Sequence, residues 1–517
     1  MRLVNRFGLA VLAILAFAGS ALGAQDPGAS AVWPSGTAVV SYENEQALAA
    51  ALARHPATIV RRIPALRVAA LRPTGDVARF AARFDAEPGI ARVEKAAARR
   101  SLVEPALASL STAALQWQYA AVRADQVPAS VSQAAAGITI AVVDTGADLD
   151  APDLAAKSPQ SYSVRTRSPQ VSDPNGHGTF VAALAAGSSS NGDGVAGISG
   201  DSPLLLIQAG GADGAFTDVD EAAAIVYAVD HGARIVNLSL GGPTTSAIER
   251  RAIDYAVSKG VLLVAAAGNG FERGNAAEYP AALLQPLGSK GVGGRGLSVA
   301  ASTREGAHAS FSTTGTHVSL AAPGAGVFSA LSSSSSTARY PRTALPGSLG
   351  GVYGYGSGTS FAAPQVAGAA ALVWAANPQL RAADVASILE QTASGGGSWN
   401  AELGYGVLDV AAAVARAQQV VAAPAPTPAA VTDLRLRGKR TGTRVVLWWK
   451  AAPGAVDYRV SVAPDRHASH VVSSGDRTSA TLELARGSRY SFTVAALEAA
   501  GNEIAASAAW RVRIPNR

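Results

Sequence analysis

The 517-residue chain carries 43 Lys and Arg against 37 Asp and Glu, a formal net charge of +6, and it contains no cysteine. A length of this order predicts about three domains, and the absence of cysteine excludes disulfides, thiolate metal sites and a cysteine nucleophile. The charge is uneven, because 13 basic and 8 acidic residues lie before residue 106 and leave a near-neutral remainder of 30 against 29. We therefore expect no nucleic-acid partner.

The first 24 residues have the pattern of a secretory signal peptide. Arg2 and Arg6 are followed by an apolar run at 7–17 and then by small residues up to Ala24. The run is shorter than the roughly 20 residues that span a bilayer, so the pattern favours a cleavable signal (1–24) over a stable membrane anchor. We expect a secreted protein, located outside the cell, in the periplasm or at the cell surface.

Residues 37–96 alternate short strands and helices in a β-α-β-β-α-β order. Strands are predicted at 37–42, 58–63, 66–71 and 90–95, and helices at 44–54 and 77–84. This order is that of a ferredoxin-like α+β unit. An Ala- and Arg-rich stretch follows at 96–109, which we expect to be exposed and without regular structure. A small domain between a signal peptide and a larger domain indicates a removable propeptide at 25–107.

Buried strands and helices alternate in the next region, 108–419. A continuous apolar run at 137–143 is typical of a buried parallel strand, and the segments 234–242 and 261–270 read as two more buried strands that run into Gly-rich ends. Helices are predicted at 222–231, 246–259, 362–373 and 381–393. The alternation predicts an α/β fold with a doubly wound parallel sheet, and the runs end in Gly-rich segments, where such sheets place their sites.

Three residue types suited to nucleophilic catalysis lie in Gly-rich segments of this region. They are Asp144 in DTG, His177 in NGHGT and Ser360 in GSGTSFAAP, and Asn269 ends the run AAAGN. A serine nucleophile needs a base within hydrogen-bond reach, and that base needs a third group to fix its tautomer. An amide donor stabilises the oxyanion that forms. Taken singly, each residue also has an ordinary structural explanation: a turn-capping carboxylate, a buried histidine, a Gly/Ser loop before a core helix, and a turn asparagine.

In this order and combination, the motifs resemble those of the subtilisin-like serine proteases, or subtilases, over about residues 117–417. The resemblance implies that Asp144 orients the imidazole, that His177 is the general base and then the acid, and that Ser360 is the nucleophile. It assigns Asn269 to the oxyanion hole. It also implies a serine endopeptidase made as a self-processing zymogen, with polypeptides as substrates and its own propeptide as an intramolecular inhibitor.

The resemblance extends to the substrate-binding segments. The segment SLGG at 239–242 matches the strand that pairs with the main chain of the substrate. The implied substrate-binding residues are Ser239, Leu240, Gly241, Ala266 and Gly268. Because no charge lies in these segments, we expect an apolar or aromatic residue before the scissile bond.

Catalysis by such a triad needs no cofactor, but the resemblance implies structural calcium. Asp153 and Asn191 align with a calcium site of many subtilases, and oxygen ligands suit this cation. The alternative is that these residues and the neighbouring acids, Asp148, Asp150 and Asp193, are solvated loop residues.

The C-terminal region changes to strand periodicity after a Pro-rich linker at 420–430. Alternating apolar residues then resemble a fibronectin type III sandwich at 431–517, with Trp449 in its core and Tyr490 as its corner tyrosine. We expect this all-β domain to attach the enzyme to a surface or to act as a spacer, and we expect a monomer.

Two other functions are consistent with parts of the pattern. An esterase of the α/β-hydrolase type requires GxSxG with an acid and a histidine after the serine. Here Ala362 replaces the second glycine, and only His467 and His470 follow, beyond the linker. A non-catalytic binding protein on a protease scaffold is the second alternative, and the complete set of motifs argues against it.

Overall fold

The computed structural model describes residues 36–102, 115–192, 194–335, 340–343, 345, 350–420, 432–452, 455, 457–464, 470–475, 478–497 and 503–515. The predicted signal peptide, Asp193 and the linker at 421–430 lie outside the described residues. Within the described parts of the chain, no helix is long and apolar enough to cross a membrane.

The N-terminal unit has the predicted ferredoxin-like order. Its elements are β1 (Ala38–Tyr42), α1 (Glu45–Arg54), β2 (Ala57–Ile63), β3 (Val68–Pro73), α2 (Val77–Asp85) and β4 (Ile90–Lys95), and the sheet order is β2-β3-β1-β4. Asn44 and Asp76 cap the two helices, accepting the backbone N–H of Ala47 at 2.9 Å and of Arg79 at 2.6 Å. The third strand begins later than predicted, because Pro64–Leu66 forms a 3-10 turn.

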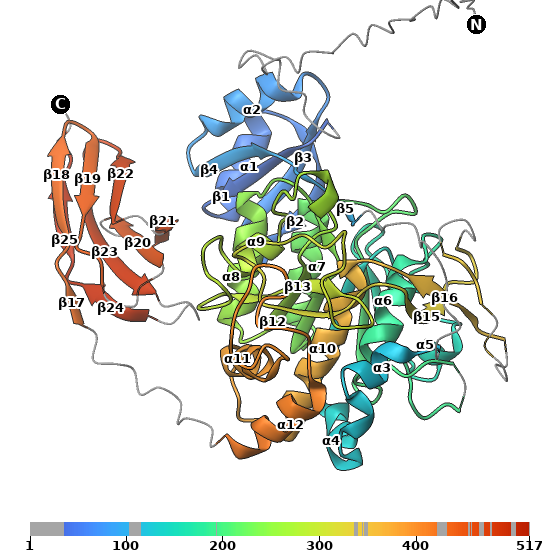
Figure 1. The fold of residues 1–517 in the computed structure, drawn as a ribbon. Coiled ribbons are helices and arrows are strands. Elements are labelled where there is room, and N and C mark those ends of the chain that lie inside the picture. Colours follow the sequence, from blue (N-terminus) through green and yellow to red (C-terminus); the bar gives the residue numbers. More distant parts are fainter. Residues whose placement is uncertain are drawn as a thin grey trace, which may run out of the picture.

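Both faces of this small sheet are buried. Val40 and Leu71 belong to a cluster with the side chains of α1 and α2, whereas Val39 and Val68 belong to a cluster with helices of the next unit. Successive residues of a strand point to opposite faces. Because both faces are buried here, successive residues of these strands are apolar and do not alternate with polar ones. The N-terminal unit therefore lies against the central unit (Figure 1) and depends on it for half of its core.

The central unit is built on the predicted parallel sheet. Its strands are β6 (Ile140–Asp144), β7 (Gln160–Ser163), β8 (Leu204–Gln208), β10 (Ile235–Leu238), β12 (Leu262–Ala266), β13 (Gly296–Ser302) and β14 (Leu320–Pro323). Their order is β14-β13-β12-β10-β6-β8-β7, and every adjacent pair is parallel. The ends of β6, β10 and β12 thus meet at one edge of the sheet.

Helices cover both faces of this sheet, as a doubly wound fold requires. One core contains side chains of α6 (His177–Ala186), α10 (Thr359–Ala376), α11 (Ala382–Thr392) and α12 (Val410–Gln419). The opposite core contains side chains of α7 (Asp218–Asp230) and α8 (Ala247–Ser258). Smaller elements are α3 (Trp117–Ala121), α4 (Ala129–Ala134), α5 (Pro152–Ala155), α9 (Ala281–Leu284), β15 (Val327–Leu331) and β16 (Val352–Gly356).

The C-terminal unit is the predicted all-β sandwich. Its strands are β17 (Thr432–Leu434), β18 (Arg437–Thr441), β19 (Arg444–Trp448), β20 (Asp457–Pro464), β21 (His470–Gly475), β22 (Ser479–Glu483), β23 (Arg489–Leu497), β24 (Glu503–Ser507) and β25 (Trp510–Arg513). They form two sheets, β17-β24-β23-β20-β21 with β25 beside β23, and β18-β19-β22. Trp449 is in the core as predicted, and the hydroxyl of Tyr490 donates to the Ala485 carbonyl at 3.4 Å, the contact of a corner tyrosine.

Candidate active site

Asp144 and His177 come together at the edge where the parallel strands end. Asp144 is the last residue of β6 and His177 the first residue of α6, and His177 Nδ1 lies 2.7 Å from Asp144 Oδ1. Both side chains are buried. The same carboxylate oxygen accepts the backbone N–H of Thr145 at 2.7 Å, so the acid is held from two directions.

A second carboxylate, Asp173, fixes the start of the helix that bears the histidine. It accepts the N–H of Gly176 at 2.9 Å, the hydroxyl of Thr145 at 2.7 Å, and both the N–H (2.8 Å) and the hydroxyl (2.7 Å) of Thr179. These bonds satisfy N–H groups of the first turn that have no partner inside the helix. The sequence reading missed Asp173; its position just before a helix start was the available signal.

Ser360 is the second residue of α10 and lies next to the end of β10. Its Oγ donates to the carbonyl of Ser239 at 3.3 Å, and its own carbonyl accepts the Ser239 hydroxyl at 2.7 Å. A helix N-terminus supplies backbone N–H groups and a favourable dipole for developing negative charge. The location therefore suits a nucleophilic hydroxyl.

Asn269 follows β12 and is tied to the residue before this serine. Its Oδ1 accepts both the N–H and the hydroxyl of Thr359, each at 2.9 Å. Because the amide group is planar, this arrangement directs the NH₂ end away from Thr359. Asp144, Ser239 and Asn269 thus follow three adjacent strands, and the structure brings the four residues predicted for catalysis to one edge of the sheet.

A segment of the chain itself lies between two strands near Ser360, and the space between these two strands is called the groove below. β5 (Ala98–Ser101) lies between β11 (Leu240–Gly241) and β9 (Ala215–Thr217) and is antiparallel to both. Ser101 is opposite Leu240, so the ladder continued by one residue puts Leu102 opposite Ser239. The expectation that 96–109 is exposed and irregular is wrong for this part, because both neighbouring strands supply main-chain partners that a local reading of the sequence cannot see.

The predicted substrate-binding residues surround this segment. Leu240 contributes its backbone, and Leu102 and Ala266 belong to the same apolar cluster. A Cβ at Gly241 would lie 2.8 Å from Leu102 Cδ2, and a Cβ at Gly268 would lie 3.0 Å from Glu278 Oε1. Glycine at both positions therefore leaves the space that the leucine and the glutamate occupy.

Glu278 introduces a charge that the predicted pocket segments lack. Its Oε2 would be 2.8 Å from a Cβ at Gly241, on the same side as Leu102. Burial raises the pKa of Glu278, and the charge of Arg273 opposes this rise. Nothing in the sequence around Glu278 distinguishes it from a solvated loop acid.

The two residues predicted to bind calcium lie at the α5 side of the unit. Asp153, in α5, is buried, and its Oδ1 accepts the N–H of Val195 at 2.7 Å. Val195 follows the loop that contains Asn191. No group of three or more His, Asp or Glu side chains that could hold a metal is found among the described residues.

Comparisons with known proteins match each part of the chain. The Subtilase family matches residues 135–406, the fibronectin type III domain matches 429–513, and the fervidolysin N-terminal prodomain matches 21–96. Thermitase of Thermoactinomyces vulgaris is 34% identical over 258 residues, which cover 50% of this chain and 81% of that protein.

Other relatives are similar over the same region. A thermophilic serine proteinase of Bacillus sp. (strain AK1) is 35% identical over 263 residues, 51% of this chain, and the match spans only 58% of that relative's length. The chain is also similar to the solved structure of fervidolysin from Fervidobacterium pennivorans, described as a keratinolytic enzyme related to subtilisin. The match covers 92% of this chain and 73% of the fervidolysin chain, with a TM-score of 0.64. At 24% identity, that likeness shows the fold.

Proposed function

Because the chain belongs to the subtilase family of serine endopeptidases, we propose that it hydrolyses peptide bonds with Ser360 as nucleophile, His177 as base and then acid, and Asp144 as the group that orients the imidazole. The observation that carries the proposal is the peptide-like pairing of β5 with β11, whose register runs toward Ser239, the residue that accepts the Ser360 hydroxyl. A main chain bound as an added strand is held in the way that a protease holds its substrate.

In the proposed reaction, Ser360 Oγ attacks the carbonyl carbon of the scissile bond while its proton passes to His177 Nε2. The oxyanion accepts N–H groups from the Asn269 side chain and from the Ser360 backbone. When the C–N bond breaks, His177 gives the proton to the leaving amine and an acyl-enzyme remains. Water then attacks the acyl carbon in the same manner and releases the acid, and Asp144 stays ionised throughout.

The proposed precursor is secreted and processes itself. A signal peptide at 1–24 directs export, and the propeptide, predicted at 25–107, occupies the groove of its own enzyme. We propose self-cleavage after Leu102, a few residues before the predicted end, because the β5 register extended by one residue puts Leu102 opposite Ser239, which accepts the Ser360 hydroxyl. The mature enzyme acts as a monomer on polypeptides outside the cell, and it prefers an apolar or aromatic residue, such as this leucine, before the scissile bond.

A structural calcium ion is part of the proposal. The buried carboxylate of Asp153 and the amide oxygen of Asn191 are hard ligands that suit calcium. The loop closes tightly on the carboxylate, because a Cβ at Gly194 would lie 2.0 Å from Asp153 Oδ1. Calcium at 100 times its Kd should stabilise the fold by about 2.7 kcal/mol. Thermal unfolding with calcium and with a chelator tests this, and an unchanged Tm contradicts it.

The function is tested with the purified chain and its Ser360→Ala variant. The wild type should cleave casein, lose activity with phenylmethylsulfonyl fluoride and shorten at its N-terminus. The variant should remain at the full length less the signal peptide and leave casein intact. Normal self-cleavage in the variant rules out Ser360 as the nucleophile, and an inactive wild type favours the non-catalytic scaffold.

A further inference from the structure

The register of β5 makes it possible to count the positions of a bound peptide. Extended by one residue, this register puts Leu102 opposite Ser239, whose carbonyl accepts the Ser360 hydroxyl. With Leu102 taken as the first residue before the bond to be cut, Arg99 is the fourth. Arg99 is paired through its backbone on the β9 side, opposite Phe216. Its side chain leaves the groove between α7 and α8.

The guanidinium of Arg99 is held by one carboxylate from each of these helices. Its Nε donates to Oε2 of Glu221 and to Oε1 of Glu249 at 3.2 Å each, and its Nη2 lies 2.8 Å from the same Glu249 oxygen. All three side chains have no solvent exposure. A third N–H, on Nη1, donates to the carbonyl of Ala98 at 3.0 Å. Ion pairs of this depth are charge-assisted and shielded from salt.

The pocket holds more acid than this one cation balances. Asp218, at the start of α7, is also buried, and burial raises its pKa to about 6. Burial, and then the negative charge of Glu249, raises the pKa of Glu221 well above its usual range. Among the described residues, Glu221 Oε1 has no hydrogen-bond partner. Removing the guanidinium would leave buried carboxylates without compensation, which is strongly unfavourable.

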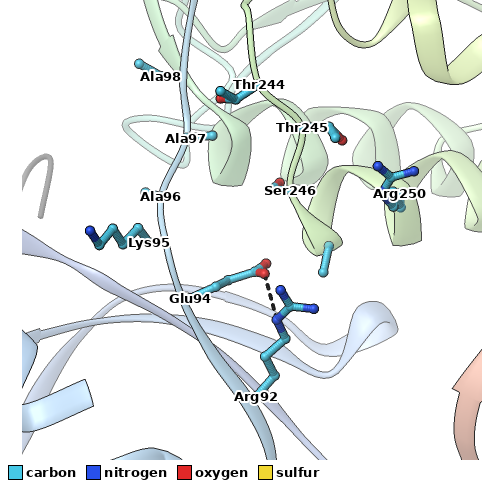
Figure 2. Close-up of a pocket in the computed structure, with 11 residues that line it drawn as sticks. Arg92, Glu94, Lys95, Ala96, Ala97, Ala98, Thr244, Thr245, Ser246 and Arg250 are labelled. Carbon is cyan, nitrogen blue, oxygen red and sulfur yellow. Dashed lines mark ion pairs between the residues drawn. The ribbon is translucent and has the colours of Figure 1, made fainter. Parts of the chain in front are cut away.

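The close packing around the Arg99 side chain does not extend to the residues next to it. Ala98 and Arg100, on either side of Arg99, are exposed. Upstream, residues 96–98 border a cavity of about 550 Å³ whose other wall includes Thr244, Thr245 and Ser246 (Figure 2). Thr245 forms part of the cavity wall and also donates its hydroxyl to Glu249 Oε2 at 2.7 Å. The buried site that Glu221 and Glu249 form around Arg99, called the acid pocket below, therefore lies next to a separate cavity that the chain does not fill.

From this geometry we infer that Glu221 and Glu249 form a specificity pocket for an arginine side chain at the fourth residue before the scissile bond, in substrates as well as in the propeptide. The inference rests on the proposed proteolysis at Ser360. Arginine suits the pocket better than lysine, because its planar guanidinium donates from Nε to carboxylates on two helices and from Nη1 to the Ala98 carbonyl, whereas an ammonium is a single point charge.

The test measures kcat/KM of the self-processed enzyme on four fluorogenic peptides. They have the form X-Arg-Ser-Leu-aminocoumarin, where X is arginine, citrulline, lysine or alanine. Citrulline retains the shape of arginine and most of its donors but carries no charge. The arginine peptide should be cleaved at least about 30-fold more efficiently than the citrulline peptide, with lysine between them and alanine near citrulline.

Variants then locate the preference. Glu221→Gln and Glu249→Gln should each reduce the ratio of arginine to citrulline cleavage. Glu305→Gln removes one negative charge from an exposed turn of the same unit and should leave the ratio unchanged. The wild-type ratio alone tests the inference if a variant fails to fold.

The outcomes separate the inference from the proposed function. Equal cleavage of the arginine and citrulline peptides by an enzyme that still digests casein overturns the pocket and leaves proteolysis standing. A ratio that survives in both glutamine variants also overturns it. Failure to cleave any peptide or casein contradicts the proposed function, and the inference with it.

Discussion

The two ends of the groove are built in different ways. At the Ser360 end, every group comes from the central unit and is held by bonds within it, such as those of Asp173 and Thr359. At the Arg99 end, the central unit supplies only the acids, and the cation comes from a segment that precedes Glu221 by 122 residues and Glu249 by 150. The groups at the first end are held within the central unit, whereas the acids of the second end are paired with a cation from the N-terminal part of the chain.

This difference predicts how each end responds to substitution. Changes at the first end should lower the rate for all substrates, because they affect the transition state. Changes at the second end should alter which peptide is bound, or the stability of the precursor, and leave the chemical step intact.

Among substitutions that leave Ser360, His177 and Asp144 in place, the largest effect on rate is expected from Asn269→Ala in the mature enzyme. Loss of one oxyanion-hole donor costs about 10²–10³ in kcat in subtilisin, and we expect the same here, with KM little changed. Steady-state kinetics on one arginine-containing peptide measure it. A loss confined to KM would instead make Asn269 a binding residue.

Arg99→Ala should destabilise the precursor without impairing the chemistry. Removing one partner of a buried ion pair costs about 3–5 kcal/mol, and here two carboxylates lose their cation. The measurement is denaturant unfolding in a Ser360→Ala background, which keeps the chain unprocessed. Arg100→Ala, on the exposed neighbour, is the matched control and should change the free energy of unfolding by less than about 1 kcal/mol. Equal effects of the two changes would contradict the burial of the Arg99 ion pairs.

Asp173→Asn should affect both stability and rate at the first end. The carboxylate accepts four hydrogen bonds, and an amide oxygen cannot accept all of them while its NH₂ faces other donors. Each buried donor left unpaired costs about 1–3 kcal/mol. We therefore expect a lower Tm together with a lower kcat, and no change in either for Asp213→Asn, an exposed acid. A normal kcat would show that His177 is positioned without it.

Glu278→Gln should give the smallest change, one of specificity and pH. Burial raises the pKa of Glu278, so its carboxyl is neutral at lower pH and acquires charge as the pH rises through that pKa. With rising pH, kcat/KM for peptides with lysine before the scissile bond should increase relative to kcat/KM for peptides with leucine there. The glutamine variant should not show this increase. A trend that persists in the variant points to another group.

The same contrast explains what could be predicted from the sequence. Asp144, His177, Ser360 and Asn269 lie in short Gly-containing motifs, and the order and combination of these motifs, through the resemblance to subtilases, point to them as candidates. The ferredoxin-like elements of the N-terminal unit and three central strands, β6, β10 and β12, were predicted from local sequence patterns, whereas β8 and β13 of the same sheet were not. Glu221 lies in the acidic first turn of α7, where a charge normally faces solvent. In the structure it is buried and paired with Arg99 of β5, 122 residues earlier in the chain, and a local sequence pattern cannot show such a contact.

The most direct measurement is the intact mass of the propeptide fragment at early times of self-processing. The central claim is that Leu102 is the residue before the bond that Ser360 cuts, with Arg99 in the acid pocket. It predicts that the first fragment released ends at Leu102, and that the mature chain begins at Val103 before any trimming. A first cut at another bond, such as that after residue 107, would contradict the register and the pocket assigned to Arg99.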